Sequence, residues 1–100
     1  MKALPLSERL IPWVMNGRKT STVRLGRRNY EVGKAVLVCR ETSIPIKILS
    51  VSYSRVRELD EITAISEGYT SLDDLKRELV HFYPSIAEDS EITIVRFKII

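Results

Sequence analysis

The chain has 100 residues, of which 44% are hydrophobic and 29% are charged, with 4 Gly, 4 Pro and a formal net charge of +3. This composition excludes intrinsic disorder and leaves room for one domain, so we expect residues 1–100 to fold as a single unit without disulfide or metal crosslinks. No apolar stretch approaches the ~20 residues of a membrane-spanning helix, and the first residues lack a secretory signal, which together predict a cytoplasmic protein with no membrane partner.

The first predicted element is a short helix. Helical spacing relates three large apolar residues, Leu10, Trp13 and Val14. Because proline lacks the amide proton that a helix interior needs, Pro12 places the start of this helix near itself. Asn16 and Gly17 supply the left-handed residue that ends it.

Strands follow this helix in the first half of the chain. The β-branched alternation of residues 20–25 predicts one strand, and a polar loop at 26–29 comes next. The apolar run at 35–40 predicts a buried strand. Residues 44–53 predict a long third strand whose period slips at 49–50, which indicates a bulge.

The second half changes to a helical period after Glu58 and ends in a strand. Leu59, Ile62 and Ile65 are expected to line one side of a helix that ends at Gly68. Ser71 caps a second helix, which ends at Pro84 and has an apolar stripe of Leu72, Leu75, Leu79 and Phe82. Residues 92–100 predict the last strand. Short strands with two helices before the last one indicate an α+β domain built around a curled, mixed sheet or barrel.

Residues 17–24, with the sequence GRKTSTVR, carry the candidate chemistry. In a strand, Thr20, Thr22 and Arg24 point to one face, with Lys19 at the corner before them. A desolvated lysine can take the proton of a threonine hydroxyl and make it a nucleophile, and Arg24 could then hold a phosphate or a developing oxyanion. On spacing alone, a Thr-rich strand with exposed basic residues is the more ordinary interpretation.

Charge is segregated along the chain. Residues 1–57 carry twelve Lys or Arg and three Glu, whereas residues 58–100 carry four Lys or Arg and ten Asp or Glu. Between residues 18 and 28 no acid interrupts five basic residues, Arg18, Lys19, Arg24, Arg27 and Arg28. A polyanionic partner and a basic surface neutralised by the acidic half of the fold explain this pattern equally well.

Glu67 is a candidate because a carboxylate at the carboxyl end of a helix is disfavoured by roughly 0.3–1 kcal/mol. A surface role is its more ordinary interpretation. If Glu67 pairs with Lys19, it raises the lysine pKa and opposes the base role, unless desolvation outweighs it or Glu67 relays the proton. Tyr69 is the best of the aromatic residues that could stack on a base.

Two other reactive residue types offer little chemistry. Cys39 and His81 are the only cysteine and histidine, which excludes an internal disulfide and a Cys/His zinc site. We therefore expect no metal and no cofactor. Cys39 ends an apolar strand and His81 lies on the outer side of a helix, so neither is given a catalytic role.

Residues 17–24 resemble the G-x-K-x-x-x-x-R signature of ASCH domains, members of the PUA-like superfamily. The turn and strand at 32–38, the segment 67–76, residues 82–84 and the last strand also resemble that family, so the resemblance covers nearly the whole chain. It implies a small PUA-like mixed β-barrel with short helices packed at its side. It also implies a cleft, lined by the signature, that faces RNA or a nucleoside.

Within that family, the size and layout are similar to the small amidohydrolases that remove the acetyl group from N4-acetylcytidine. Those enzymes use a lysine, a threonine and a glutamate, which carry over onto Lys19, Thr22 and Glu67. The resemblance implies that Thr22 attacks the acetyl carbonyl while Lys19 and Glu67 manage its proton. It also implies a set of residues that bind substrate or RNA, namely Arg18, Thr20, Arg24, Arg27, Arg28 and Tyr69.

Two further functions stay open at the level of the sequence. A non-catalytic RNA-binding module is the main alternative, since the first half of the chain is strongly basic. Ribonuclease activity ranks last because His81 has no second histidine to complete an acid and base pair.

Overall fold

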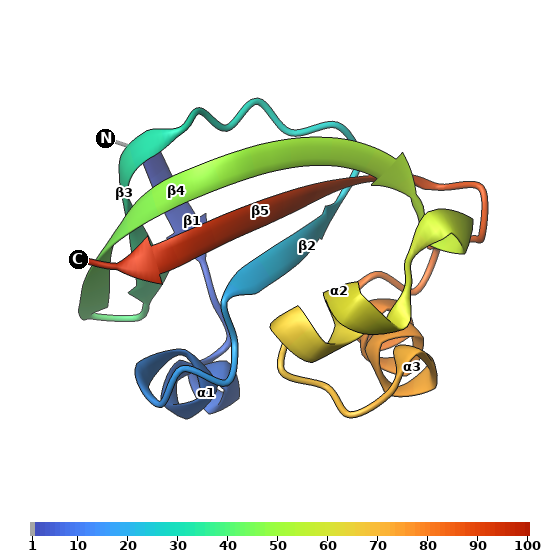
Figure 1. The fold of residues 1–100 in the computed structure, drawn as a ribbon, viewed down its shortest axis with the longest axis horizontal. Coiled ribbons are helices and arrows are strands. Elements are labelled where there is room, and N and C mark those ends of the chain that lie inside the picture. The colour runs from blue at the N-terminus through green and yellow to red at the C-terminus, as the bar shows by residue number, and fades with distance from the viewer. Residues whose placement is uncertain (1) are drawn as a thin grey trace.

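The computed structural model describes residues 2–100. Its five strands form one sheet in the order β1-β3-β4-β5-β2, drawn in Figure 1. The strands are β1 (Lys2–Pro5), β2 (Ser21–Leu25), β3 (Gly33–Cys39), β4 (Thr42–Arg55) and β5 (Glu91–Ile99). β1 is parallel to β3, and the other neighbours are antiparallel. The sheet is therefore mixed, as the sequence predicts.

The sheet curls into a half-barrel, so its two edge strands approach one another. The side chain of Arg24 on β2 donates a hydrogen bond from Nη2 to the carbonyl oxygen of Pro5 on β1. β4 is 14 residues long, and its register with β5 shifts between Ile48 and Ser50. A bulge bends and twists its strand. The predicted bulge at 49–50 is thus confirmed, and it lies in the strand that spans the curl.

Apolar side chains are buried on both faces of this sheet. Inside the curl lies a cluster that includes Leu4, Leu37, Ile46, Ile48, Val95 and Phe97. A second cluster joins the outer face of β2 and β5 to the helices, and includes Val23, Ala64, Leu75, Leu79 and Ile92. Because β2 contributes to both faces, Ser21, Thr22 and Val23 are all buried even though β2 is an edge strand.

The helices lie along one side of the sheet (Figure 1). They are α1 (Ile11–Met15), α2 (Glu61–Ser66) and α3 (Leu72–Phe82), with 3-10 turns at Glu8–Leu10 and Val56–Glu58. Pro12 lies in the first turn of α1, and Ser71 caps α3 by accepting from the amide of Asp74, as predicted. Among residues 2–100, none of these helices is long and apolar enough to span a membrane.

One expectation about the helices is wrong, and one strand is not predicted from the sequence. Ile62 and Ile65 do not line a buried face, since 72% and 62% of their surfaces are exposed. Asp60 caps α2 by accepting from the amide of Thr63, so the helix starts at Glu61 and turns Thr63 and Ala64 inward instead. The sequence does not predict strand β1, because its four residues include a single buried position and so give almost no periodic signal.

Candidate functional site

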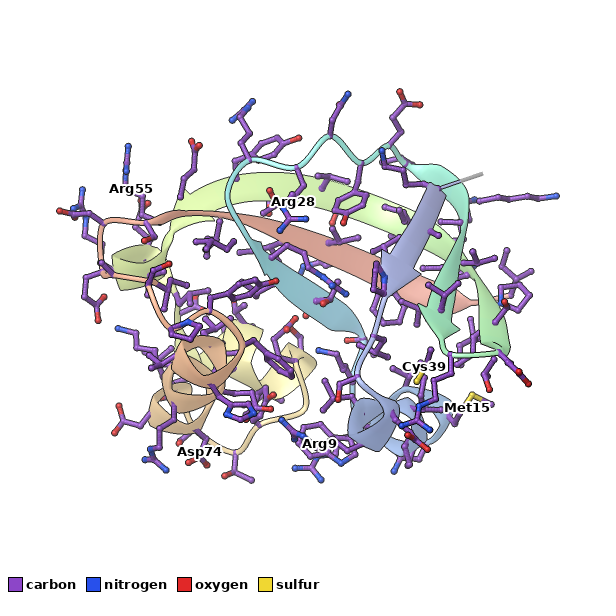
Figure 2. The ribbon with its side chains drawn as sticks, turned by 180° about the vertical axis from the view of Figure 1, so that it is seen from behind. Arg9, Met15, Arg28, Cys39, Arg55 and Asp74 are labelled. Carbon is purple, nitrogen blue, oxygen red and sulfur yellow. The ribbon has the colours of Figure 1, made fainter. Side chains whose placement is uncertain are left out.

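A cavity of about 170 Å³ lies between the end of β1, the free edge of β2 and the helix α3. The residues that line it include Lys19, Thr22, Arg24, Glu67 and Tyr69. Glu78 of α3 also lines it and forms an ion pair with Arg9, which lies between α1 and α3 in Figure 2. Five of the nine candidate residues from the sequence therefore meet in one cavity.

Backbone hydrogen bonds bring Lys19 to the end of α2. Gly17 has a left-handed φ of +82°, which turns the chain after α1. The Lys19 amide donates to the carbonyl of Trp13 over 2.8 Å, and the Thr20 amide donates to the carbonyl of Ser66 over 2.8 Å. The entry to β2 is thus docked on the last turn of α2, directly beside Glu67.

Lys19 and Glu67 form a buried ion pair. Lys19 Nζ lies 3.1 Å from Glu67 Oε1, and the two residues are only 4% and 2% exposed. Glu67 is the C-cap residue of α2. The surface interpretation of Glu67 therefore does not apply, because the residue at this helix end faces inward toward a cation.

Three donors hold the Glu67 carboxylate. Oε1 accepts from Lys19 Nζ and from the amide of Val23, each over 3.1 Å. Oε2 accepts from Ser21 Oγ, which lies 2.7 Å from Ser66 Oγ. Because β2 is an edge strand, the Val23 amide is free to bind a side chain instead of a neighbouring strand.

Burial lowers the pKa of Lys19 below its ordinary value of 10.5. Desolvation is the largest cause, the charge and hydrogen bond of Glu67 oppose it, and the charge of Arg24 lowers the pKa further. Burial therefore has a larger effect on the pKa of Lys19 than the ion pair with Glu67 has. A larger share of Lys19 is neutral near pH 7 than for an exposed lysine, which is what a general base requires.

Thr22 presents a free hydroxyl to the same cavity. The residue is 4% exposed, and within residues 2–100 its hydroxyl has no hydrogen-bond partner. Thr22 lies opposite Val95, which belongs to the inner core, whereas Val23 belongs to the cluster under the helices. The cavity at the edge of β2 is open to both faces of the strand.

Arg24 and Tyr69 add donors to the cavity wall. Arg24 Nε is buried and has no partner within residues 2–100. Burial is the largest cause that raises the pKa of Tyr69 to about 12, so its hydroxyl stays protonated at neutral pH. The Tyr69 ring meets Trp13 edge to face with centroids 5.3 Å apart, which fixes its orientation.

Arg18 lies outside the cavity and supports its wall. Its guanidinium lies 3.8 Å from the centroid of the Trp13 ring, and its Nε donates to the carbonyl of Gly68 over 2.6 Å. Gly68 has a φ of +97°, and a Cβ there would lie 2.8 Å from Trp13 Cε3. Trp13 therefore contacts both Arg18 and Tyr69, and through it the Arg18 side chain supports the ring that lines the cavity.

Thr20, Arg27 and Arg28 do not line the cavity either. Thr20 is exposed and borders a separate hollow of about 250 Å³. Arg27 stacks 3.7 Å from the centroid of Tyr53. Arg28 Nε donates to the carbonyl of Leu25 over 2.8 Å, and Figure 2 places Arg28 at the end of β2 that is remote from α1.

Sequence reasoning missed Ser21, which donates to Glu67, and Ser66, whose hydroxyl pairs with that of Ser21. Their pairing depends on contact between β2 and α2 and leaves no periodic signal in the sequence. Within residues 2–100, no group of three or more His, Cys, Asp or Glu residues could hold a metal ion. The candidate reactive groups in the cavity wall include Lys19, the carboxylates of Glu67 and Glu78, the hydroxyls of Thr22 and Tyr69, and Arg24.

The comparisons with known proteins agree on the fold. The chain resembles an ASCH domain from Lactobacillus crispatus at 20% identity with a TM-score of 0.80, covering 98% of this chain and 79% of that one. For the hypothetical protein PH0355 the identity is 18%, the TM-score is 0.76 and both chains are fully covered, at 100% each. For the S128A mutant of ZmASCH from Zymomonas mobilis the identity is 12%, the TM-score is 0.68, and 96% of this chain and 66% of that one are covered.

No curated protein matches the sequence. The family described as ASCH domain matches residues 2–100, which is nearly the entire chain. The half-barrel, and a cavity lined by Lys19, Thr22 and Arg24 of residues 17–24, agree with the resemblance found in the sequence. The chain belongs to the ASCH domain family.

Proposed function

We propose that this protein is an amidohydrolase that removes the acetyl group from N4-acetylcytidine or a related modified pyrimidine nucleoside. The observation that carries the proposal is the buried Lys19, whose pKa is lowered and which shares one cavity with the free hydroxyl of Thr22. A lysine whose pKa is lowered and a hydroxyl in the same cavity are the two groups, a base and a nucleophile, that acyl transfer requires.

In the first step Lys19 Nζ accepts the proton of Thr22 Oγ1 while that oxygen attacks the acetyl carbonyl carbon. The bond between the acetyl carbon and N4 then breaks, and N4 leaves as an amine with the proton returned from Lys19. The acetyl group remains on Thr22 as an ester. Glu67 stabilises the lysine in its charged state, because its Oε1 is already within 3.1 Å of Nζ.

In the second step water attacks the ester, with Lys19 again accepting a proton. The products are acetate and the regenerated Thr22 hydroxyl. In both steps negative charge develops on the acetyl oxygen. The unpartnered Nε of Arg24 is the donor in the cavity wall that supports stabilisation of this charge.

The dimensions of the cavity favour a small substrate. Its volume of about 170 Å³ is below the roughly 300–1,000 Å³ of pockets for drug-sized ligands. One acylated ring suits this space better than a peptide. The protonated Tyr69 hydroxyl can donate to a ring carbonyl or nitrogen, which favours a polar heterocycle.

The test incubates the purified protein with N4-acetylcytidine and detects cytidine and acetate by chromatography. We expect turnover by the wild type, its loss in Lys19→Ala and Thr22→Ala, and partial activity in Thr22→Ser, which keeps a hydroxyl. Thr20→Ala is the matched control, since Thr20 lies outside the cavity, and it should retain wild-type rates. Full turnover by a folded Thr22→Ala protein would reject the nucleophile, and no turnover by the wild type would reject the activity.

The alternative is a non-catalytic RNA-binding domain. It is favoured by the presence of Arg24 and Tyr69 in one cavity, because an arginine and an aromatic ring are the groups that bind a phosphate and an unstacked base. Wild-type protein that binds RNA but releases no acetate would support it. In that case Arg24→Ala and Tyr69→Ala should each weaken RNA binding.

A further inference from the structure

Glu78 interrupts the apolar face that α3 turns toward the cavity. Helical spacing places Leu75, Glu78, Leu79 and Phe82 on one side of α3, and all four line the cavity. Leu75 and Leu79 are buried there. Glu78 therefore puts a charge at a position that this pattern assigns to an apolar residue, and a break of this kind is typical of functional positions.

The Glu78 carboxylate has acceptor capacity that the fold does not use. Its Oε1 is buried, and its ion-pair partner is Arg9, which Figure 2 places between α1 and α3. Within residues 2–100 no second side chain or amide donates to Glu78, whereas three donors hold Glu67. Because a carboxylate has about four lone-pair sites, Glu78 can accept hydrogen bonds from a ligand in the cavity.

Exposure indicates which end of the cavity opens to solvent. The side chains of Lys19 and Glu67 are each 3% exposed, whereas those of Glu78 and Arg9 are 19% and 49% exposed. The ion pair of Arg9 and Glu78 therefore marks the mouth of the cavity. A pyrimidine nucleoside acylated at N4 carries its sugar on the opposite side of the ring, at N1. A substrate whose acetyl group reaches Thr22 thus has its sugar toward this mouth.

We propose that Glu78 binds the 2′- and 3′-hydroxyls of a ribonucleoside substrate and makes the enzyme selective for a free ribose. The proposal rests on the proposed hydrolase function. Two neighbouring hydroxyls can each donate to one oxygen of a carboxylate, in charge-assisted hydrogen bonds. An internal nucleotide of RNA has a phosphate on its 3′-oxygen, which removes one donor and adds a charge that the carboxylate repels. Glu78 therefore favours a nucleoside over a polymer.

The test compares N4-acetylcytidine with N4-acetyl-2′,3′-dideoxycytidine, which keeps the base and the sugar ring but lacks both hydroxyls. We expect the wild type to favour the ribonucleoside in kcat/KM by about tenfold, as for hydrogen bonds to a charged group. Glu78→Gln has a similar size but no charge, and it should bring this ratio close to one. Glu88→Gln is the matched control, because Glu88 pairs with Lys76 of α3 and does not line the cavity, and it should keep the wild-type ratio.

Arg9→Gln separates sugar binding from a structural role of the ion pair. This substitution removes the ion pair but keeps the Glu78 carboxylate, so it should reduce the ratio less than Glu78→Gln does. An equal loss in the two variants would show that Glu78 acts by holding Arg9, and would overturn the proposal. The same ratio in the wild type and in Glu78→Gln would also overturn it.

Binding of cytidine and 2′,3′-dideoxycytidine distinguishes this proposal from the hydrolase function. Isothermal titration calorimetry needs no turnover, and we expect the wild type, but not Glu78→Gln, to bind cytidine the more tightly. That result without any acetate release would support the ribose site and reject the hydrolase. Turnover of both acetylated substrates with no preference between them would support the hydrolase and reject the ribose site.

Discussion

The pKa of Lys19 sets the pH dependence expected of the reaction. In the proposed reaction the neutral amine of Lys19 is the base, and its pKa lies below 10.5, so kcat/KM for N4-acetylcytidine should rise with pH through an apparent pKa below that value. Lys19→Arg keeps a positive charge beside Glu67 but cannot release a proton at these pH values, so it should lower kcat/KM by roughly 10²–10⁴-fold. A pH-rate profile that rises only above pH 10.5 would argue against Lys19 as the base.

Ser21 is expected to contribute to stability through the Glu67 carboxylate. Its hydroxyl is fully buried and donates to Glu67 Oε2, so Ser21→Ala leaves a buried carboxylate oxygen without its donor. The expected cost is about 1–3 kcal/mol in the free energy of unfolding, measured by urea denaturation. The neighbouring Thr20 is exposed, and Thr20→Ala should change the free energy by less than about 0.5 kcal/mol. Equal effects of the two substitutions would contradict this role.

At the level of elements, the connection between α2 and α3 depends on Gly68. A Cβ at this position would lie 2.8 Å from Trp13 Cε3, whereas one at Gly26, which also has positive φ, would meet nothing within 4 Å. Gly26→Ala should therefore lower the free energy of unfolding by about 1–2 kcal/mol, through left-handed backbone strain alone. Gly68→Ala should lower it by about 2–5 kcal/mol, because steric overlap with Trp13 is added to that strain. The difference between their Tm values measures the contact, and equal values would show that it is unimportant.

The sequence predicted the elements that have strong periodic or capping signals. These include β2, β5, α3 with its Ser71 cap, and the bulge in β4, where the alternation of buried residues slips at 49–50. It failed for α2, because a helix of 6 residues gives too few positions to define a face. It gave Lys19, Thr22 and Glu67 as candidates, but the burial that lowers the lysine pKa arises from the docking of β2 on α2, which no local pattern contains.

For the molecule as a whole, Lys19 and Tyr69 predict how stability changes between neutral and alkaline pH. At pH values between the lowered pKa of Lys19 in the folded protein and its ordinary value of 10.5, the lysine is protonated in the unfolded chain but not in the folded protein. The free energy of unfolding therefore rises with pH in this range. Tyr69 acts in the opposite sense, because its pKa rises from 10.0 to about 12 on folding, so stability falls with pH across that interval.

Urea denaturation at pH values from neutral to alkaline measures these two effects. Lys19→Met should abolish the rise, and Tyr69→Phe should reduce the fall above pH 10.0. A wild-type curve that is unchanged by Lys19→Met would show that the lysine has the same proton affinity in the folded and unfolded states.

The pairing of β2 has a consequence for the order in which parts of the protein fold during synthesis. Thr22 lies on β2, an edge strand that pairs with β5 in the sheet formed by residues 2–100, with Thr22 opposite Val95. During synthesis on a ribosome the segment with Lys19 and Thr22 emerges early, but the strand that completes its backbone hydrogen bonds emerges after both α2 and α3. The long loop between β2 and β5 must close before the contacts that stabilise it can form. We therefore expect Lys19 to become buried only at the end of folding, so that its amine is solvated in the nascent chain and does not have the lowered pKa of the folded protein.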